Sequence, residues 1–107
     1  MSDTYSIIYS PKSIDDLKRI YSYIAFKLNA PDAAEHQANR IRTTIRSLDI
    51  MPSRNPIVDW EPWKSMNTHK VPVDNYIVYY TIDNNDFIVT IVRIFYNSGR
   101  NLKNIMK

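Results

Sequence analysis

Hydrophobic residues recur along this chain with two different periods, and the two periods predict its elements. Residues 11–28 and 32–48 carry apolar side chains three and four positions apart, which is typical of one face of a helix. Residues 5–9 alternate in polarity, and residues 68–73, 76–82 and 87–96 are rich in β-branched and aromatic side chains. These four segments are predicted strands, so the expected order of elements is β-α-α-β-β-β.

The first predicted helix begins at Ser10-Pro11, because serine caps a helix and proline fits its first turn without losing a hydrogen bond. One face of this helix is expected to be buried and the other to face water. The expected buried positions are Ile14, Leu17, Ile20 or Tyr21, Ile24 and Leu28, and the expected solvent-facing positions are Asp15, Asp16, Lys18, Arg19 and Lys27.

The second predicted helix follows a break at Asn29-Ala30-Pro31-Asp32 and ends before Pro52. Small alanines near its start allow a close approach to the first helix, so the two helices are expected to form an antiparallel hairpin. Residues 52–67 have no regular period and are expected to form an ordered loop, whose Trp60 and Trp63 pack in the core. The apolar seam of the second helix is Ala34, Ala38, Ile41, Ile45 and Leu48.

The last two predicted strands are joined by Asp83-Asn84-Asn85-Asp86, where the two asparagines suit the positive φ of a two-residue hairpin turn. That turn places Ile82 opposite Phe87, Tyr80 opposite Val89, Val78 opposite Ile91 and Tyr76 opposite Arg93. We therefore expect one domain, residues 1–107, of the α+β class. Its helical hairpin would pack on one face of a curled, mostly antiparallel four-stranded sheet.

The amino-acid composition excludes several kinds of functional site. The 107 residues include no cysteine, which excludes disulfides and thiolate chemistry, and one glycine, which excludes glycine-rich phosphate loops. No His, Asp or Glu cluster has the spacing of metal ligands, so no metal or other cofactor is predicted. No apolar run reaches the roughly 20 residues of a membrane helix, so we expect no membrane partner and a cytoplasmic location.

The net charge of +3 is unevenly distributed. Residues 93–107 hold four basic residues and no acidic one, which leaves ten basic and eleven acidic residues in the rest of the chain. The basic excess therefore belongs to the C-terminal end, which is the expected contact surface for a target or for an acidic partner. The four basic residues are Arg93, Arg100, Lys103 and Lys107.

Three features together resemble the RelE/ParE superfamily, the toxins of type II toxin–antitoxin modules. They are the helical hairpin after a first strand, the segment Val71-Pro72-Val73-Asp74-Asn75-Tyr76-Ile77-Val78-Tyr79-Tyr80, and the ending Val92-Arg93-Ile94-Phe95-Tyr96-Asn97-Ser98-Gly99-Arg100-Asn101. The resemblance implies growth arrest unless a cognate antitoxin is bound, and toxin and antitoxin form higher-order complexes in some cases. Its RelE and YoeB branches cut messenger RNA on the ribosome, and its ParE branch inhibits DNA gyrase.

The resemblance divides the candidate site residues between these two branches. Tyr76 stands where the nucleases carry a strand arginine, and Phe95 stands where a histidine would support Tyr96, so both positions resemble ParE. Glu61-Pro62-Trp63-Lys64 resembles the Glu-Pro-Leu-Lys stretch of YoeB-like nucleases, in which the glutamate is the proposed base. In a nuclease, Glu61 would be the base and Tyr96 the acid, and the phosphate would be held by Lys64, Lys70, Arg93, Arg100 and Lys103.

The strand around Arg93 adds a geometric condition. Strict alternation directs Arg93 and Tyr96 to opposite faces of the sheet, so a shared site needs the strand to end or bulge near Phe95. Arg93 itself has two interpretations, a contact to an anion or partner, or packing over an aromatic ring. Gyrase inhibition is therefore the first expected function and ribosome-dependent mRNA cleavage the second. The third is a non-toxic protein that binds an antitoxin as a co-repressor.

Overall fold

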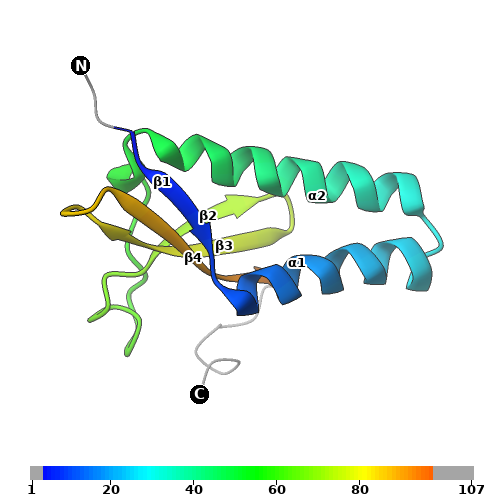
Figure 1. Ribbon diagram of the computed structural model, residues 1–107. Coiled ribbons are helices and arrows are strands. Elements are labelled where there is room, and N and C mark those ends of the chain that lie inside the picture. The colour runs from blue at the N-terminus through cyan, green and yellow to red at the C-terminus, as the bar shows by residue number, and fades with distance from the viewer. Residues whose placement is uncertain (1–3, 98–107) are drawn as a thin grey trace.

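A computed structural model describes residues 4–97 of the chain. The elements are β1 (Ser6–Tyr9), α1 (Pro11–Ser22), the π-helical turn η1 (Tyr23–Lys27), α2 (Pro31–Arg46), the 3-10 turns η2 (Ser47–Asp49) and η3 (Pro52–Arg54), β2 (His69–Val73), β3 (Tyr76–Asp83) and β4 (Ile88–Tyr96). The sheet order is β1-β4-β3-β2, with β1 parallel to β4 and the other neighbours antiparallel. Two helices thus pack on a four-stranded mixed sheet, which confirms the α+β prediction (Figure 1).

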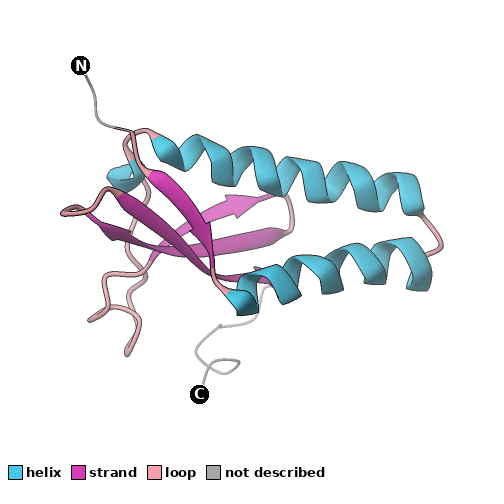
Figure 2. Ribbon diagram, in the orientation of Figure 1, coloured by secondary structure: helices cyan, strands magenta, loops and turns pink. Residues whose placement is uncertain are grey.

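The helical hairpin lies along one side of the sheet, and its far end projects beyond the strands (Figure 2). Ser10 caps α1 by accepting a hydrogen bond from the Ser13 N–H at 3.1 Å, as its position before Pro11 suggests. No helix within residues 4–97 combines the length and the apolar character needed to cross a membrane.

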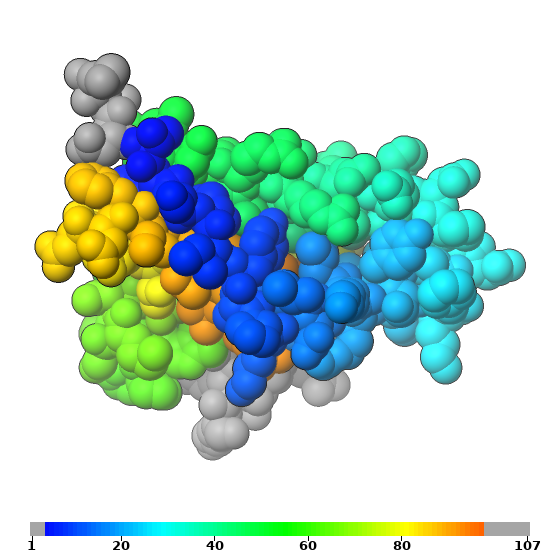
Figure 3. Space-filling model, in the orientation of Figure 1, coloured from blue at the N-terminus to red at the C-terminus, as the bar shows by residue number. Residues whose placement is uncertain are grey.

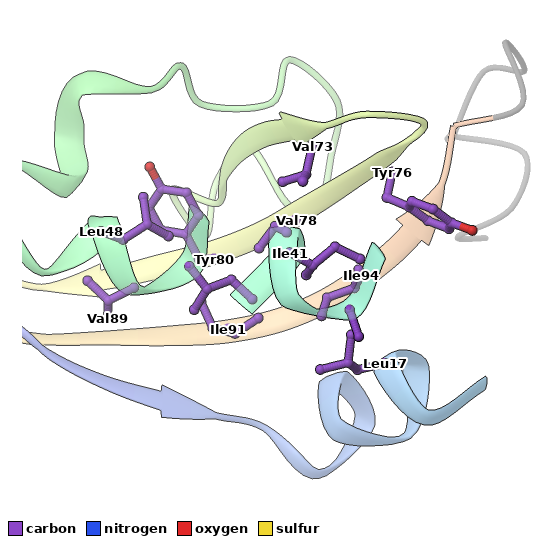
Figure 4. Packing of buried hydrophobic residues seen from close by; sticks show 12 residues of the cluster. Leu17, Ile41, Leu48, Val73, Tyr76, Val78, Tyr80, Val89, Ile91 and Ile94 are labelled. Carbon is purple, nitrogen blue, oxygen red and sulfur yellow. The ribbon is translucent and has the colours of Figure 1, made fainter. Parts of the chain in front are cut away.

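The seam of α2 confirms the predicted periodicity. Ala34, Ala38, Ile41, Ile45 and Leu48 are all buried, with Leu48 in the 3-10 turn that follows the helix. All but Ala34, which packs with Ile24 and Ala25, form one cluster with the central strands (Figure 4), whose members include Val78, Tyr80, Val89 and Ile91. Burial of each large aliphatic side chain contributes roughly 1.5–3 kcal/mol, so this interface is the main source of stability.

The predicted faces of the first helix, expected over residues 11–28, are wrong at three positions. Ile14 and Leu28 are 42% and 56% exposed, although the spacing placed both on the buried face. Asp16 is 4% exposed, although the spacing placed it in water. The physical reason for Asp16 is that α1 packs beside the edge of β4 as well as on α2. The Ile94 N–H at that edge needs an acceptor, and the Asp16 carboxylate supplies it.

The β3–β4 register also differs from the prediction. Asp83 Oδ1 accepts hydrogen bonds from the N–H groups of Asn85 (2.9 Å) and Asp86 (3.1 Å), which closes a longer turn than two residues. Phe87, rather than an asparagine, takes the positive φ of 55°. The observed pairs are Ile82 with Val89, Tyr80 with Ile91, Val78 with Ile94 and Tyr76 with Tyr96.

The face of the sheet away from the helices is covered by the segment 57–68, here called the tryptophan loop. Trp60 and Trp63 pack edge-on against Tyr79, with ring centroids 6.4 and 5.1 Å away, and Val58 fills the space beside them. The loop is closed by a hydrogen bond from the Val58 N–H to the Thr68 carbonyl at 2.9 Å. Both tryptophans therefore pack in a second small core, as expected.

Candidate functional site

Arg93 is held by a carboxylate that the helix pattern had placed in water. Its Nε and Nη2 donate to Asp16 Oδ2 and Oδ1 at 2.8 and 2.9 Å, in a two-pronged pair. The Asp16 carboxylate raises the pKa of Arg93 above its ordinary value, although burial acts in the opposite direction. The guanidinium also lies 4.4 Å from the centre of the Phe95 ring. One polar edge of the guanidinium, formed by Nε and Nη2, and one of its faces thus make contacts within the protein.

Asp16 also closes the edge of β4. β1 pairs with β4 only as far as Tyr9 and Ile91, and beyond that point the β4 edge has lost its strand partner. Ser10 takes over, since its N–H donates to the Ile91 carbonyl (3.0 Å) and its hydroxyl to the Val92 carbonyl (2.9 Å). Asp16 Oδ2 then accepts the Ile94 N–H at 2.9 Å. The Asp16–Arg93 pair is therefore a structural clamp between α1 and β4.

Tyr96 lies on the other side of β4 from Arg93. The only bulge between β3 and β4 is at Val92, before Arg93 and not near Phe95, so alternation holds from Arg93 to Tyr96. Tyr96 packs edge-on against Tyr76, with centroids 5.5 Å apart. Burial raises the pKa of Tyr76, and the neighbouring Tyr96 and Tyr23 raise it further. These three tyrosines line a hollow of about 590 Å³ together with Ile24, Leu28, Ala33, Gln37 and Asn75.

The remaining nuclease candidates belong to the tryptophan loop and to β2. Glu61 Oε1 accepts the Ser65 N–H at 2.9 Å, and hydrogen bonds from Ser65 lower the pKa of Glu61, which makes it a weaker base. Lys64 is exposed, and its backbone N–H donates to the Trp60 carbonyl. Lys70 Nζ lies 5.7 Å from the centre of the Trp60 ring. These groups border the aromatic cover of the sheet rather than an open cleft.

The predicted acid, base and cation are therefore not brought together. Glu61 contacts Ser65, Tyr96 contacts Tyr76, and Arg93 contacts Asp16 and Phe95. Arg100 and Lys103 lie outside the described residues. Arg93, the predicted phosphate-binding residue, is not a free cation in this structure, because its guanidinium has a carboxylate partner and lies over the Phe95 ring. Lys70 and Arg93 do share one aromatic surface, formed by Trp60, Tyr79 and Phe95.

The family follows from comparison with known proteins. Residues 7–99 match the family model described as the ParE toxin of the type II toxin–antitoxin system parDE. The chain belongs to this ParE toxin family. It is accordingly a type II toxin of the RelE/ParE superfamily, as its ending and its strand pattern suggested. No curated protein sequence matches it.

Solved structures agree with this ParE-family fold. A chromosomal ParDE TA system from P. aeruginosa matches with a TM-score of 0.71 and 17% identity, over 87% of this chain and 96% of that one. The RelBE2 toxin–antitoxin complex from Mycobacterium tuberculosis gives 0.63 and 18%, over 88% and 92%. The archaeal RelE–RelB complex from Pyrococcus horikoshii OT3 gives 0.61 and 14%, over 91% and 99%. At these identities the similarity shows the fold alone.

Two features of this ParE-family chain had no signal in the sequence. Asp16 and Arg93 are 77 positions apart, and a helical period cannot indicate that a solvent-side aspartate meets a strand edge. Tyr9 lies between α1 and α2 with Arg42 and Arg46 near its ring, yet these residues come from separate elements. The residues of each group come together only when the chain folds and brings their separate elements into contact.

Proposed function

We propose that this toxin arrests growth by inhibiting DNA gyrase when it is free of a cognate antitoxin. The choice of gyrase as the target rests on one observation, which is that the residues a nuclease would need lie apart from one another. RNA cleavage by the 2′-hydroxyl needs a base, an acid and cations around one phosphate. Here Glu61, Tyr96 and Arg93 each contact different partners, and Arg93 is neutralised by Asp16.

The proposed antitoxin partner is supported by the related structures, which include a ParDE TA system and RelB complexes of RelE-fold toxins. A toxin with such a partner acts where gyrase and ribosomes are found, so we place it in the cytoplasm. Whether the complex assembles further is part of the same proposal. A higher-order toxin–antitoxin particle would be seen directly by light scattering.

The decisive experiment follows both targets in the same culture. On induction, the gyrase proposal expects relaxed or broken plasmid DNA and intact transcripts within the first minutes of arrest. Purified toxin added to purified gyrase, relaxed plasmid and ATP should then inhibit supercoiling. Rapid transcript cleavage with normal supercoiling would overturn the proposal.

Two conservative variants, Glu61→Gln and Tyr96→Phe, distinguish gyrase inhibition from RNA cleavage. Each removes a proton-transferring group and retains the shape of the side chain, so a nuclease would lose at least about 100-fold in activity. A gyrase inhibitor should keep its toxicity in both variants. Circular dichroism checks that each variant is folded.

Messenger RNA cleavage remains the second candidate because Lys70 and Arg93 do share one face with the tryptophan loop that carries Glu61. A purified ribosome programmed with a short message would detect it. A folded protein with no effect on growth, supercoiling or transcripts would instead favour the co-repressor function, which binding to an antitoxin and its promoter DNA would test.

A further inference from the structure

The hollow that contains the three tyrosines lies where the end of the helical hairpin meets the ends of β3 and β4. Its volume is about 590 Å³, and its wall comes from η1, the start of α2, the β2–β3 turn, β3 and β4. Figure 3 shows this hairpin end, the cyan atoms, extending beyond the rest of the molecule. None of the described residues that line the hollow is charged. The hollow is therefore a concave, neutral surface assembled from both layers of the fold.

Tyr76 presents an unpaired polar group to this hollow. The residue is 8% exposed, and its ring packs with the main core and against Tyr96. Figure 4 shows its hydroxyl directed away from the buried cluster. No residue within the range 4–97 forms a hydrogen bond with that hydroxyl. Buried polar side chains usually have a partner, so a hydroxyl left open on a hollow is available to a ligand.

A π-helical turn forms one rim of the hollow. The Leu28 N–H donates to the Tyr23 carbonyl, five positions back, at 3.1 Å. This wider turn shifts the helical period, so Leu28 leaves the buried face that the period assigns to it. Leu28 is 56% exposed and Tyr23 is 55% exposed, and Tyr96 on the opposite rim is 56% exposed. Turns of this kind are rare and frequently occur at functional sites.

Two amide side chains add hydrogen-bonding capacity without charge. Gln37 donates from Nε2 to Asp74 at 3.0 Å, and no described residue bonds its Oε1. The Asn75 backbone carbonyl accepts the Asn97 N–H at 2.6 Å, and the Asn75 side-chain amide has no partner among the described residues. The hollow thus offers one hydroxyl and two amides to a ligand.

The neutral lining limits the chemistry of that ligand. A phosphate, carboxylate or ammonium group would lose its hydration in the hollow and gain no opposite charge, which is costly. Arg40 of the neighbouring α2 surface does not supply one, because its guanidinium is paired with Asp74 at 2.7 Å. A neutral aromatic ring fits better, since tyrosine rings and Leu28 can contact its faces. A donor on the edge of that ring would pair with the hydroxyl or an amide oxygen.

The shallow rim favours a ring carried by a protein over a free small molecule. Sites for small molecules usually bury roughly 70–90% of the ligand surface. Here Tyr23, Leu28 and Tyr96 all stay more than half exposed, so a free ring would remain largely in water. An anchor side chain of a protein is covered by the protein surface around it, which excludes water from the rim.

We propose that this hollow binds a tryptophan or tyrosine side chain on the surface of a partner protein. The ring would lie among Tyr23, Leu28 and Tyr96, and its N–H or O–H would donate to the Tyr76 hydroxyl or to Gln37 Oε1. The surface around that side chain would cover the exposed rim. The site requires neither gyrase nor messenger RNA as the target, so it goes beyond the proposed function.

The test uses the whole purified protein and a capped seven-residue peptide of serine and leucine with tryptophan at its centre. In NMR titrations we expect saturable shifts of the Tyr23, Leu28 and Tyr96 resonances. The same peptide with lysine at its centre should bind at least about tenfold more weakly, because the lining offers no opposite charge. Shifts confined to other residues, or equal binding of both peptides, would overturn the inference.

Matched variants test the hollow itself. Ala33 is exposed on α2 and lines the hollow, so Ala33→Leu fills that space with a good helix former and leaves the core intact. It should weaken the tryptophan peptide at least about tenfold, because the ring loses its pocket. Thr43→Leu places the same side chain at an exposed α2 position outside the hollow and should change nothing. Tyr76→Phe should weaken binding a few-fold by removing one hydrogen bond. Equal effects of the two leucine variants would contradict the proposal.

Three further outcomes would assign the hollow to another occupant and overturn the inference. The first is free indole binding as tightly as the peptide, since indole has no surface to cover the rim. The second is peptide binding that appears only after residues 98–107 are removed. The third is a concentration-dependent dimer in sedimentation that occludes the same resonances. None of these measurements uses growth or gyrase, so the inference and the proposed function can fail separately.

Discussion

Tyr79 and Tyr80 are neighbours in β3, and both are fully buried, but their hydroxyl groups meet different surroundings. The Tyr80 hydroxyl donates to the Pro52 carbonyl and accepts from Asn55 Nδ2 at 3.0 Å. The Tyr79 hydroxyl, under the tryptophan loop, has no hydrogen-bond partner, and burial raises the pKa of Tyr79 to about 12. Adjacent side chains on opposite faces of one strand therefore make a natural pair of controls.

Tyr80→Phe should lower the free energy of unfolding by about 1–3 kcal/mol, because it leaves the buried Pro52 carbonyl and the half-buried Asn55 amide without this partner. Tyr79→Phe should be neutral or stabilising, because it removes a hydroxyl whose burial is not compensated. Urea unfolding of both variants measures the difference. Equal losses in the two variants would show that ring packing, and not the hydrogen bond, decides the effect.

Asp16 gives a second prediction at the same scale. Asp16→Ala should cost about 3 kcal/mol, since it removes the partner of a largely buried Arg93 and of the Ile94 N–H. Asp15→Ala, one position earlier and exposed, should change stability by less than about 0.5 kcal/mol. Thermal unfolding of the pair provides the measurement. Similar melting temperatures for the two variants would contradict the structural role of Asp16.

Among the elements, the β2–β3 turn is attached to α2 by charge. Asp74 occupies the turn with a φ of 56°, and it accepts hydrogen bonds from Arg40 Nε and Nη2 at 2.7 Å and from Gln37 at 3.0 Å. The Arg40 guanidinium, with help from Gln37, lowers the pKa of Asp74. A lowered folded pKa adds stability that is present above the ordinary aspartate value, near 4, and is lost as the pH falls through the folded value.

Asp74→Asn should therefore lower the melting temperature at pH 7 by a small amount, and the gap to the parent should close below about pH 4. Asparagine tolerates the same left-handed backbone, and it removes the charge together with one of the two acceptor oxygens that hold Arg40. Arg40→Gln should give the same pH profile, and Asp59→Asn, in an exposed loop position, should give none. A gap that does not change with pH would assign the loss to the missing acceptor oxygen and not to the charge.

The elements also show what a sequence can reveal in this fold. The seam of α2 was predictable because its five buried positions follow one period along α2 and into the adjoining η2 turn. The β3–β4 register was not, because a carboxylate–amide turn at Asp83 and a bulge at Val92 each shift it, and neither has a period. The clamp of Arg93 was equally hidden, because alternation in β4 sets a face but not the helix residue that meets it.

At the scale of the whole molecule, the two faces of the sheet are covered differently. The helices cover one face and leave hollows lined in part by Lys18, Arg42 and Arg46, and the opposite face is covered by aromatic rings. The main described core is built from residues between Tyr5 and Ile94. The basic excess of the sequence, by contrast, lies at its C-terminal end. The charge distribution thus predicts that folding and recognition of the target draw on separate parts of the chain.

Deletion of residues 98–107 tests this separation. The truncated chain keeps every residue of the described core, so its melting temperature should fall by less than about 4 °C. It loses Arg100, Lys103 and Lys107, so toxicity should fall sharply if the basic end contacts the target. Calorimetry and growth after induction give the two readouts.

A substitution experiment tests the role of the basic C-terminal end even if the deletion affects folding. Changing Arg100, Lys103 and Lys107 together to glutamine should weaken toxicity at an unchanged melting temperature. The matched control changes three exposed cations of the hairpin, Lys12, Arg19 and Lys27, to glutamine and removes the same total charge. Equal loss in both triple variants would mean that net charge alone drives association with the target, since long-range steering depends on total charge more than on position. Loss confined to the C-terminal variant would place the target contact at that end.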